Sequence, residues 1–299
     1  MKSCRVNKLD IGGDAPPRLM GVINCSNESF YSGSYVPLEE IHATAVAMIE
    51  QGADMIDIGA RSTAPNVQAI SGKTEADRID AALKELDGSG ITLSVDTMHP
   101  GVLDVCLKHD IHAANDISGF ISPAYARKVA DAGIPAFVMA ANRQPGDPVG
   151  VDATLTSLEG VIRRCEAVGV KEFVLDPGVG SWTPLRSLEG VIRRCEAVGV
   201  KEFVLDPGVG SWTPLRSFED DWELCRHFDE FLRFDRPVLA AVSRKTFIGM
   251  LLNREPEDRL PGTLAVTMEL LNKGASIVRA HDVAATRDII KVYEHMVKA

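Results

Sequence analysis

The chain has 299 residues, of which 45% are hydrophobic and 25% charged, and its formal net charge is -10. Length and composition are ordinary for one α/β domain with a large core. The negative charge argues against a nucleic-acid or anionic-membrane surface, and no run approaches the ~18 apolar residues of a membrane span. The six cysteines form no CxxC pair. We therefore expect a soluble, cytoplasmic protein without nucleic-acid or membrane partners.

Short apolar runs recur along the chain, and each ends in polar residues that lead into a helical pattern. A tail, residues 1–17, precedes a single domain, 18–299. The predicted strands are 19–23, 55–58, 93–95, 113–114, 135–139, 173–175, 238–242 and 276–278. Between them, the clearest helical patterns open at Pro37, cover about 74–87, follow Pro100 and cover about 262–273, and a last helix closes the chain.

One segment occurs twice without change, at 158–187 and at 188–217. Each copy reads as a helix followed by a strand that ends in Asp-Pro-Gly. With one copy counted, eight strands alternate with helices over about 269 residues, which predicts a (β/α)8 TIM barrel. The alternative is a doubly wound open sheet, but no GxGxxG follows the first strand.

A ninth strand cannot simply be added to a closed barrel, because strand number, shear and tilt are linked. We therefore expect one copy of the repeated unit to form an excursion. Two of the three possible registers leave Asp206 at the barrel mouth, and the third leaves Asp176 there. Of the two aspartates, we favour Asp206.

Polar residues at the strand ends should converge on one pocket at the carboxyl face of such a barrel. Taken singly, each is more often a helix cap or a turn residue than a catalytic group. As a set they place two carboxylates, two cations, an imidazole and two amides around one cavity. The residues are Asn24, Asp96, Asn115, Asp176 or Asp206, Lys245, Arg279 and His281.

Seven motifs, in order from about residue 18 to the end, resemble those of the dihydropteroate synthase family. They are MGVINCSNESF (20–30), DIGARSTAPN (57–66), SVDT (94–97), NDISG (115–119), VLDPGVG (174–180 and 204–210), SRKTFIG (243–249) and RAHDV (279–283). The resemblance implies a TIM barrel that joins 6-hydroxymethyl-7,8-dihydropterin pyrophosphate to p-aminobenzoate and releases pyrophosphate with Mg²⁺ present. It also suggests a homodimer formed through barrel helices.

The resemblance also implies roles for individual residues. The pterin would be bound by Asp96, Asn115, Lys245 and either Asp206 or Asp176, since carboxylates accept from its N–H groups while an amide or ammonium donates to its acceptors. Arg279, His281 and a Mg²⁺ held by Asn24 would meet the pyrophosphate. Loops for the second substrate would contribute Ser62, Thr63, Ser211, Trp212 and Arg244.

Two loops depart from the family pattern. Ala64 stands where an arginine is usual, with Arg61 in place of an acidic residue, and Ser211-Trp212-Thr213 replaces a Phe-Gly-Lys-like stretch. These variants look more like homologues from methanogen-type archaea, in which the arylamine would be the ribofuranosyl-aminobenzene phosphate of methanopterin synthesis.

Two other functions remain as alternatives. One is a pterin-binding methyltransferase domain with a corrinoid partner, in which the cations of SRK and RAH would have no pyrophosphate to bind. The other is a non-catalytic pterin-binding barrel that the repeated unit has disabled.

Overall fold

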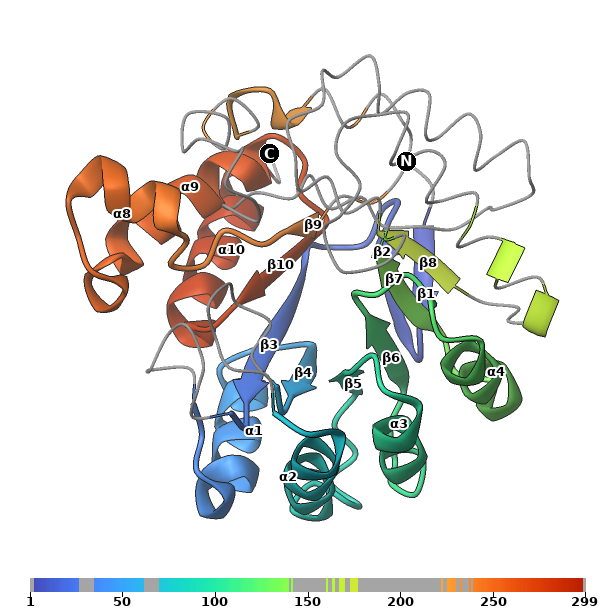
Figure 1. The fold of residues 1–299 in the computed structure, drawn as a ribbon. Coiled ribbons are helices and arrows are strands. Elements are labelled where there is room, and N and C mark those ends of the chain that lie inside the picture. The colour runs from blue at the N-terminus through green and yellow to red at the C-terminus, as the bar shows by residue number, and fades with distance from the viewer. Residues whose placement is uncertain are drawn as a thin grey trace.

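The centre of the molecule is a curled sheet of eight strands with helices packed around its outside (Figure 1). All seven strand pairings are parallel, in the order β8-β7-β6-β5-β4-β3-β10-β9. This is the predicted TIM-barrel-like α/β fold. The computed structural model describes residues 3–26, 35–61, 70–139, 141, 160, 163–164, 167–169, 173–176, 222, 225–229, 232, 237 and 239–297.

The eight strands overlap the eight predicted from the apolar runs. They are β3 (Arg18–Asn24), β4 (Met55–Gly59), β5 (Leu93–Asp96), β6 (Ala113–Asp116), β7 (Ala136–Met139), β8 (Phe173–Asp176), β9 (Leu239–Ala240) and β10 (Ile277–Ala280). β4 is buried along its whole length. Such unbroken burial is typical of a parallel strand that is covered on both faces.

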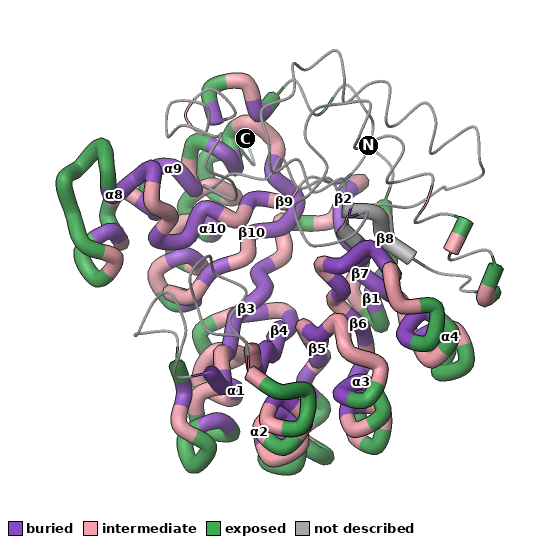
Figure 2. Tube along the Cα trace, in the orientation of Figure 1, coloured by how far each residue is buried: buried purple, intermediate pink, exposed green. Residues whose placement is uncertain are grey.

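The helices form the outer layer, with their exposed faces turned to solvent (Figure 2). Ser71 caps α2 by accepting a hydrogen bond from the Thr74 amide at 3.0 Å, and Gly133 ends α4 in the left-handed region at φ 65°. The bounds are η2 (Leu38–Glu40), α1 (Ile41–Glu50), α2 (Gly72–Lys84), α3 (Pro100–Cys106), α4 (Pro123–Ala132), α8 (Thr246–Leu252), η4 (Pro256–Asp258), α9 (Leu260–Asn272) and α10 (Val283–Val297).

The segment predicted as a tail contains an antiparallel hairpin, β1 (Ser3–Val6) with β2 (Leu9–Gly12). Val6 and Ile11 are fully buried in the main core, and the Asn7 side chain donates to Thr92 Oγ1 at 3.2 Å, just before β5 begins. The hairpin therefore contacts the end of the barrel opposite the carboxyl face. Two four-residue strands are too short to show a period, which is why the sequence did not predict them.

The sixth strand of the barrel comes from the first copy of the repeated segment. β8 pairs with β7 in the register Ala136 to Phe173 and Met139 to Asp176. Arg164, from the same copy, donates to the Gly119 carbonyl through Nε at 2.9 Å and Nη2 at 2.7 Å. Asp176 therefore ends a strand of this sheet, whereas Asp206, which we favoured for the mouth, lies outside the described residues.

Candidate active site

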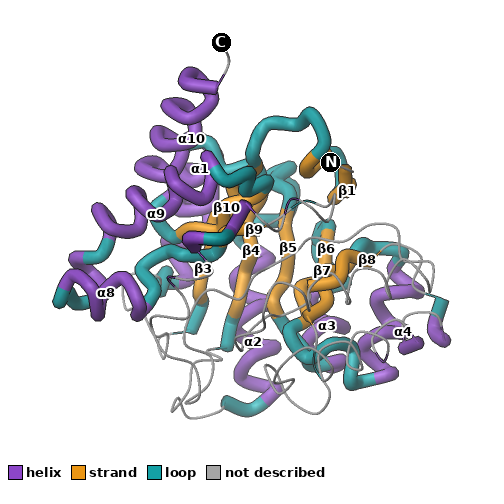
Figure 3. Tube along the Cα trace, turned by 90° about the horizontal axis from the view of Figure 1, so that it is seen from above, coloured by secondary structure: helices purple, strands orange, loops and turns teal. Residues whose placement is uncertain are grey.

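Six of the predicted site residues lie where their strands end at the carboxyl face. Figure 3 shows the strands of this sheet side by side. All six side chains are intermediate in exposure, as expected for groups that line a mouth instead of a core. They are Asn24 on β3, Asp96 on β5, Asn115 on β6, Lys245 at the start of α8, Arg279 on β10 and His281 just after β10.

Asn24 and Asp96 approach each other across Gly59, the last residue of β4. A Cβ placed on Gly59 would lie 3.6 Å from Asn24 Oδ1 and 3.9 Å from Asp96 Oδ2. These are ordinary contact distances, so the Asn24 and Asp96 oxygen atoms lie near each other beside Gly59. Oxygen atoms are the ligands that Mg²⁺ prefers. Among the described residues, no group of three or more His, Cys, Asp or Glu side chains is arranged to hold a metal ion.

Asp57 is a site residue that the sequence analysis did not assign. It lies in the middle of β4 with 1% of its surface exposed. Its Oδ2 accepts hydrogen bonds from Arg279 Nη2 at 3.0 Å and from Asn115 Nδ2 at 3.3 Å. The available signal was a single acid inside the run MIDIG, because a buried carboxylate needs polar partners.

Asp96, at the mouth, has a strongly perturbed pKa. Burial and then the nearby Asp57 carboxylate raise its pKa from 3.8 to about 7, while Arg279 opposes the rise. Near neutral pH the group is thus divided between its protonated and ionised forms. It can accept a hydrogen bond from a ligand when ionised, and donate one when protonated.

The neighbours Asn115 and Asp116 face opposite sides of β6 and have different roles. Asn115 bonds to Asp57, whereas Asp116 is fully buried and accepts hydrogen bonds from the amides of Ser118 at 2.9 Å and Phe120 at 2.6 Å. Burial raises the pKa of Asp116, and the hydrogen bonds from Ser118 and Phe120 oppose this. Asp116 therefore shapes the loop that follows β6.

His281 is neutral near pH 7 in this structure. Burial, followed by the charge of Arg279, lowers its pKa from 6.5 to about 4. Its ring Nδ1 lies 3.1 Å from Ser243 Oγ. Of the two residues expected to present positive charge to pyrophosphate, Arg279 alone is charged before ligand binds. His281 offers hydrogen-bonding nitrogen atoms instead.

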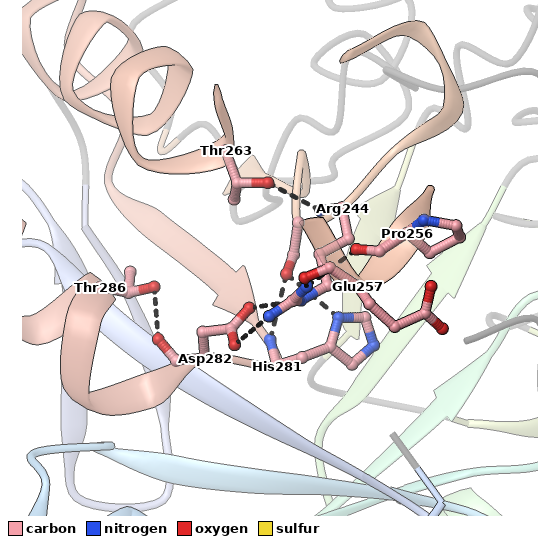
Figure 4. Close-up of polar contacts among 8 residues, drawn as sticks. Arg244, Pro256, Glu257, Thr263, His281, Asp282 and Thr286 are labelled. Carbon is pink, nitrogen blue, oxygen red and sulfur yellow. Dashed lines mark hydrogen bonds and ion pairs between the residues drawn. The ribbon is translucent and has the colours of Figure 1, made fainter. Parts of the chain in front are cut away.

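Arg244, expected in a loop for the second substrate, is held within the protein (Figure 4). Its guanidinium donates through Nε and Nη2 to the two carboxylate oxygens of Asp282, at 2.8 and 2.7 Å. Nη1 donates to the carbonyls of Pro256 and Glu257 at 2.8 and 2.7 Å. Arg244 is only 5% exposed, so the structure gives it an internal, loop-bracing position.

Arg61, which departs from the family pattern, is also bonded internally. Nε donates to Glu75 Oε2 at 2.7 Å, and Nη2 donates to the Ile70 carbonyl at 2.8 Å. The other oxygen of the fully buried Glu75 accepts from Thr97 Oγ1 at 2.5 Å. Arg61 thus ties the end of β4 to α2 and to the residue following Asp96.

Several predicted site residues lie outside the described part of the chain. For Asp176 the structure describes the backbone, which ends β8 beside Met139. The others are Ser62, Thr63, Asp206, Ser211 and Trp212.

Comparisons with known proteins point to one family. The family model described as pterin binding enzyme matches residues 20–189 and 182–281. Dihydropteroate synthase type-3 of Escherichia coli is 30% identical, over 92% of this chain and 97% of that protein. Xanthomonas albilineans dihydropteroate synthase with 4-aminobenzoic acid superposes with a TM-score of 0.73 at 29% identity, over 100% of both chains. The Coxiella burnetii dihydropteroate synthase in complex with pteroic acid gives 0.70 at 27% identity, over 98% of both chains.

Proposed function

The chain belongs to the pterin-binding enzyme family, and we propose that it is a dihydropteroate synthase. Its substrates would be 6-hydroxymethyl-7,8-dihydropterin pyrophosphate and an arylamine, and its products the joined pterin and free pyrophosphate. The observation that carries this proposal is the juxtaposition of Asp96 and Asn115 with Arg279 at one mouth, linked through Asp57. Carboxylate and amide groups suit the pterin edge, and a guanidinium suits a phosphate.

In this proposal the pterin is held by Asp96, Asn115, Lys245 and the aspartate that ends β8, Asp176. Arg279 and His281 contact the pyrophosphate. As the bond between the pterin methylene carbon and the pyrophosphate oxygen breaks, the leaving group gains negative charge, which Arg279 stabilises. The neutral arylamine nitrogen forms the new bond to that carbon and loses a proton to solvent or to the pyrophosphate.

The same reaction class calls for Mg²⁺, and the donor set at Gly59 fits it. Asn24 Oδ1 and Asp96 Oδ2 lie near each other beside Gly59, and oxygen atoms of this kind would suit the ion. Asn24, the predicted metal ligand, would hold the ion with Asp96. When bound there, Mg²⁺ would offset part of the negative charge of the pyrophosphate.

The identity of the arylamine is the finer part of the proposal. The likeness to a synthase solved with 4-aminobenzoic acid supports p-aminobenzoate. Ala64 and Ser211-Trp212-Thr213 support the archaeal-like alternative, the larger ribofuranosyl-aminobenzene phosphate. Measuring kcat/KM for both amines separates the two, and equal or better use of p-aminobenzoate would count against the larger substrate.

A homodimer in the cytoplasm completes the proposal. Apolar side chains are exposed along α8, where Met250 is 57% and Leu251 is 60% exposed, and on α10, where Met296 is 69% exposed. Such surfaces favour association through barrel helices. Cys25 and Cys106 are buried free thiols, as is usual in a reducing compartment. Burial raises their pKa to about 12. No helix in the described ranges has the length and apolar character needed to span a bilayer.

The decisive assay is pyrophosphate release from the pterin pyrophosphate with Mg²⁺ and p-aminobenzoate. Release that depends on the amine supports the synthase. Pterin binding without release in the presence of either amine would favour the non-catalytic barrel, and methyl transfer from a methylpterin to a corrinoid acceptor would favour the methyltransferase.

A further inference from the structure

Asp57 is a buried carboxylate that points into the barrel. Its neighbour Ile56 faces the helix layer, because a Cβ placed on Gly21 would lie 3.0 Å from Ile56 Cδ1 and 3.1 Å from Met48 Sδ of α1. Side chains alternate along a strand, so Asp57 projects to the opposite face. An acid at this depth is stable only with donors around it.

The donors to Asp57 come from two sides of the mouth. Its Oδ2 accepts from Asn115 on β6 and from Arg279 on β10. In the sheet order these two strands lie on opposite sides of β4, each two strands away. One carboxylate oxygen thus links Asn115, which is proposed to bind the pterin, to Arg279, which is proposed to bind the pyrophosphate.

We propose that Asp57 is a positioning residue, which fixes Asn115 and Arg279 in their ligand-binding orientations before substrate arrives. This inference rests on the proposed function. An arginine side chain has many rotamers, and holding it in place beforehand lowers the entropic cost of gripping the pyrophosphate. Asp57 itself stays beneath the mouth and need not contact substrate.

Asp57→Asn tests the inference, because it keeps the shape and an acceptor oxygen but removes the charge. Calorimetry would compare 6-hydroxymethyl-7,8-dihydropterin with its pyrophosphate ester. We expect the dissociation constant of the pyrophosphate ester to rise about tenfold, as for a weakened hydrogen bond to a charged group, and that of the unphosphorylated pterin to change less. Asp54→Asn is the matched control, since Asp54 also pairs with arginines but at the other end of β4.

Unchanged affinity for the pyrophosphate ester in a folded Asp57→Asn protein would overturn the inference. Should that variant fail to fold, Arg279→Lys probes the link from its other side. Lysine keeps the positive charge but cannot repeat the guanidinium contact with Asp57, so the dissociation constant of the pyrophosphate ester should again rise, and an unchanged constant would equally overturn the inference. These are binding measurements, so a failure of the proposed synthase reaction would be seen separately, as absent pyrophosphate release by the unmodified protein.

Discussion

Two aspartates only three residues apart serve opposite ends of the barrel and are paired differently. Asp54 uses both oxygens, with Oδ2 accepting from the Leu19 amide at 2.7 Å and Arg287 at 2.9 Å, and Oδ1 accepting from Arg18 at 3.3 Å. Asp57 accepts through Oδ2, while its buried Oδ1 has no hydrogen-bond partner among the described residues. Full pairing marks the closed end as structural, and incomplete pairing is typical of a functional mouth.

The largest expected effect concerns Arg244 and Asp282, which form a structural ion pair at the mouth. This pair would break the simple division between a structural end and a functional end. Arg244→Ala leaves the Asp282 carboxylate without its bidentate partner. We expect a loss of about 3–5 kcal/mol in the free energy of unfolding, measured by urea denaturation. The exposed Arg254 offers a control, and Arg254→Ala should change stability by less than about 0.5 kcal/mol. Similar small losses in both variants would contradict an internal role for Arg244.

Arg279→Ala sharpens the comparison from the functional side. Removing a group that meets charge on the leaving pyrophosphate should lower the rate of pyrophosphate release by about 10²–10³-fold. Binding of the unphosphorylated pterin should persist, because Asp96, Asn115 and Lys245 remain in place. Equal loss of binding for the phosphorylated and unphosphorylated pterins would remove Arg279 from the anion site.

Asp54→Asn tests the closed end. The substitution weakens pairing with two arginines and should lower the free energy of unfolding by about 1–3 kcal/mol. Turnover per folded molecule should equal that of the unmodified protein, checked by pyrophosphate release at a temperature where both are folded. Reduced turnover without reduced stability would mean that the two ends are not separate in function.

The smallest expected effect is on the pH dependence of stability. The pKa of Asp96 is higher in the folded protein than its ordinary value of 3.8, so its contribution to stability is lost as pH rises from about 4 through about 7. Asp96→Asn should remove this decline, as seen by denaturation at pH 5 and pH 7.5. A decline that persists in Asp96→Asn would have another source.

The depressed pKa of His281 has the opposite effect on stability, which is lost as pH falls from 6.5 toward about 4.

The barrel could be predicted from sequence because its signal is local and repeated. Each apolar run marks a strand, and the polar residue after it marks the carboxyl face, so Asn24, Asp96 and Arg279 were located by position alone. The comparisons with synthases support the function inferred from the motifs.

The interactions that sequence missed depend on partners far along the chain. Asp57 meets Arg279 across 222 residues, and Arg244 meets Asp282 across 38, so neither role is visible in a window around one motif. The neutral state of His281 depends on burial, which composition does not reveal. The choice between Asp176 and Asp206 could not follow from sequence either, since identical segments have identical local preferences.

The bidentate ion pair between Arg244 and Asp282 couples the SRK and RAHD motifs, so the two motifs should evolve together. Arg244 follows β9 and has a left-handed backbone at φ 54°, and it pairs with Asp282, which follows β10. The Arg244 amide also donates a hydrogen bond to Thr263 on α9. Chimeras of this barrel that exchange the loop after one of these strands should exchange the other with it. Divergence within the family is then expected to change positions 244 and 282 together, so that a substitution at one is tolerated only beside a matching change at its partner.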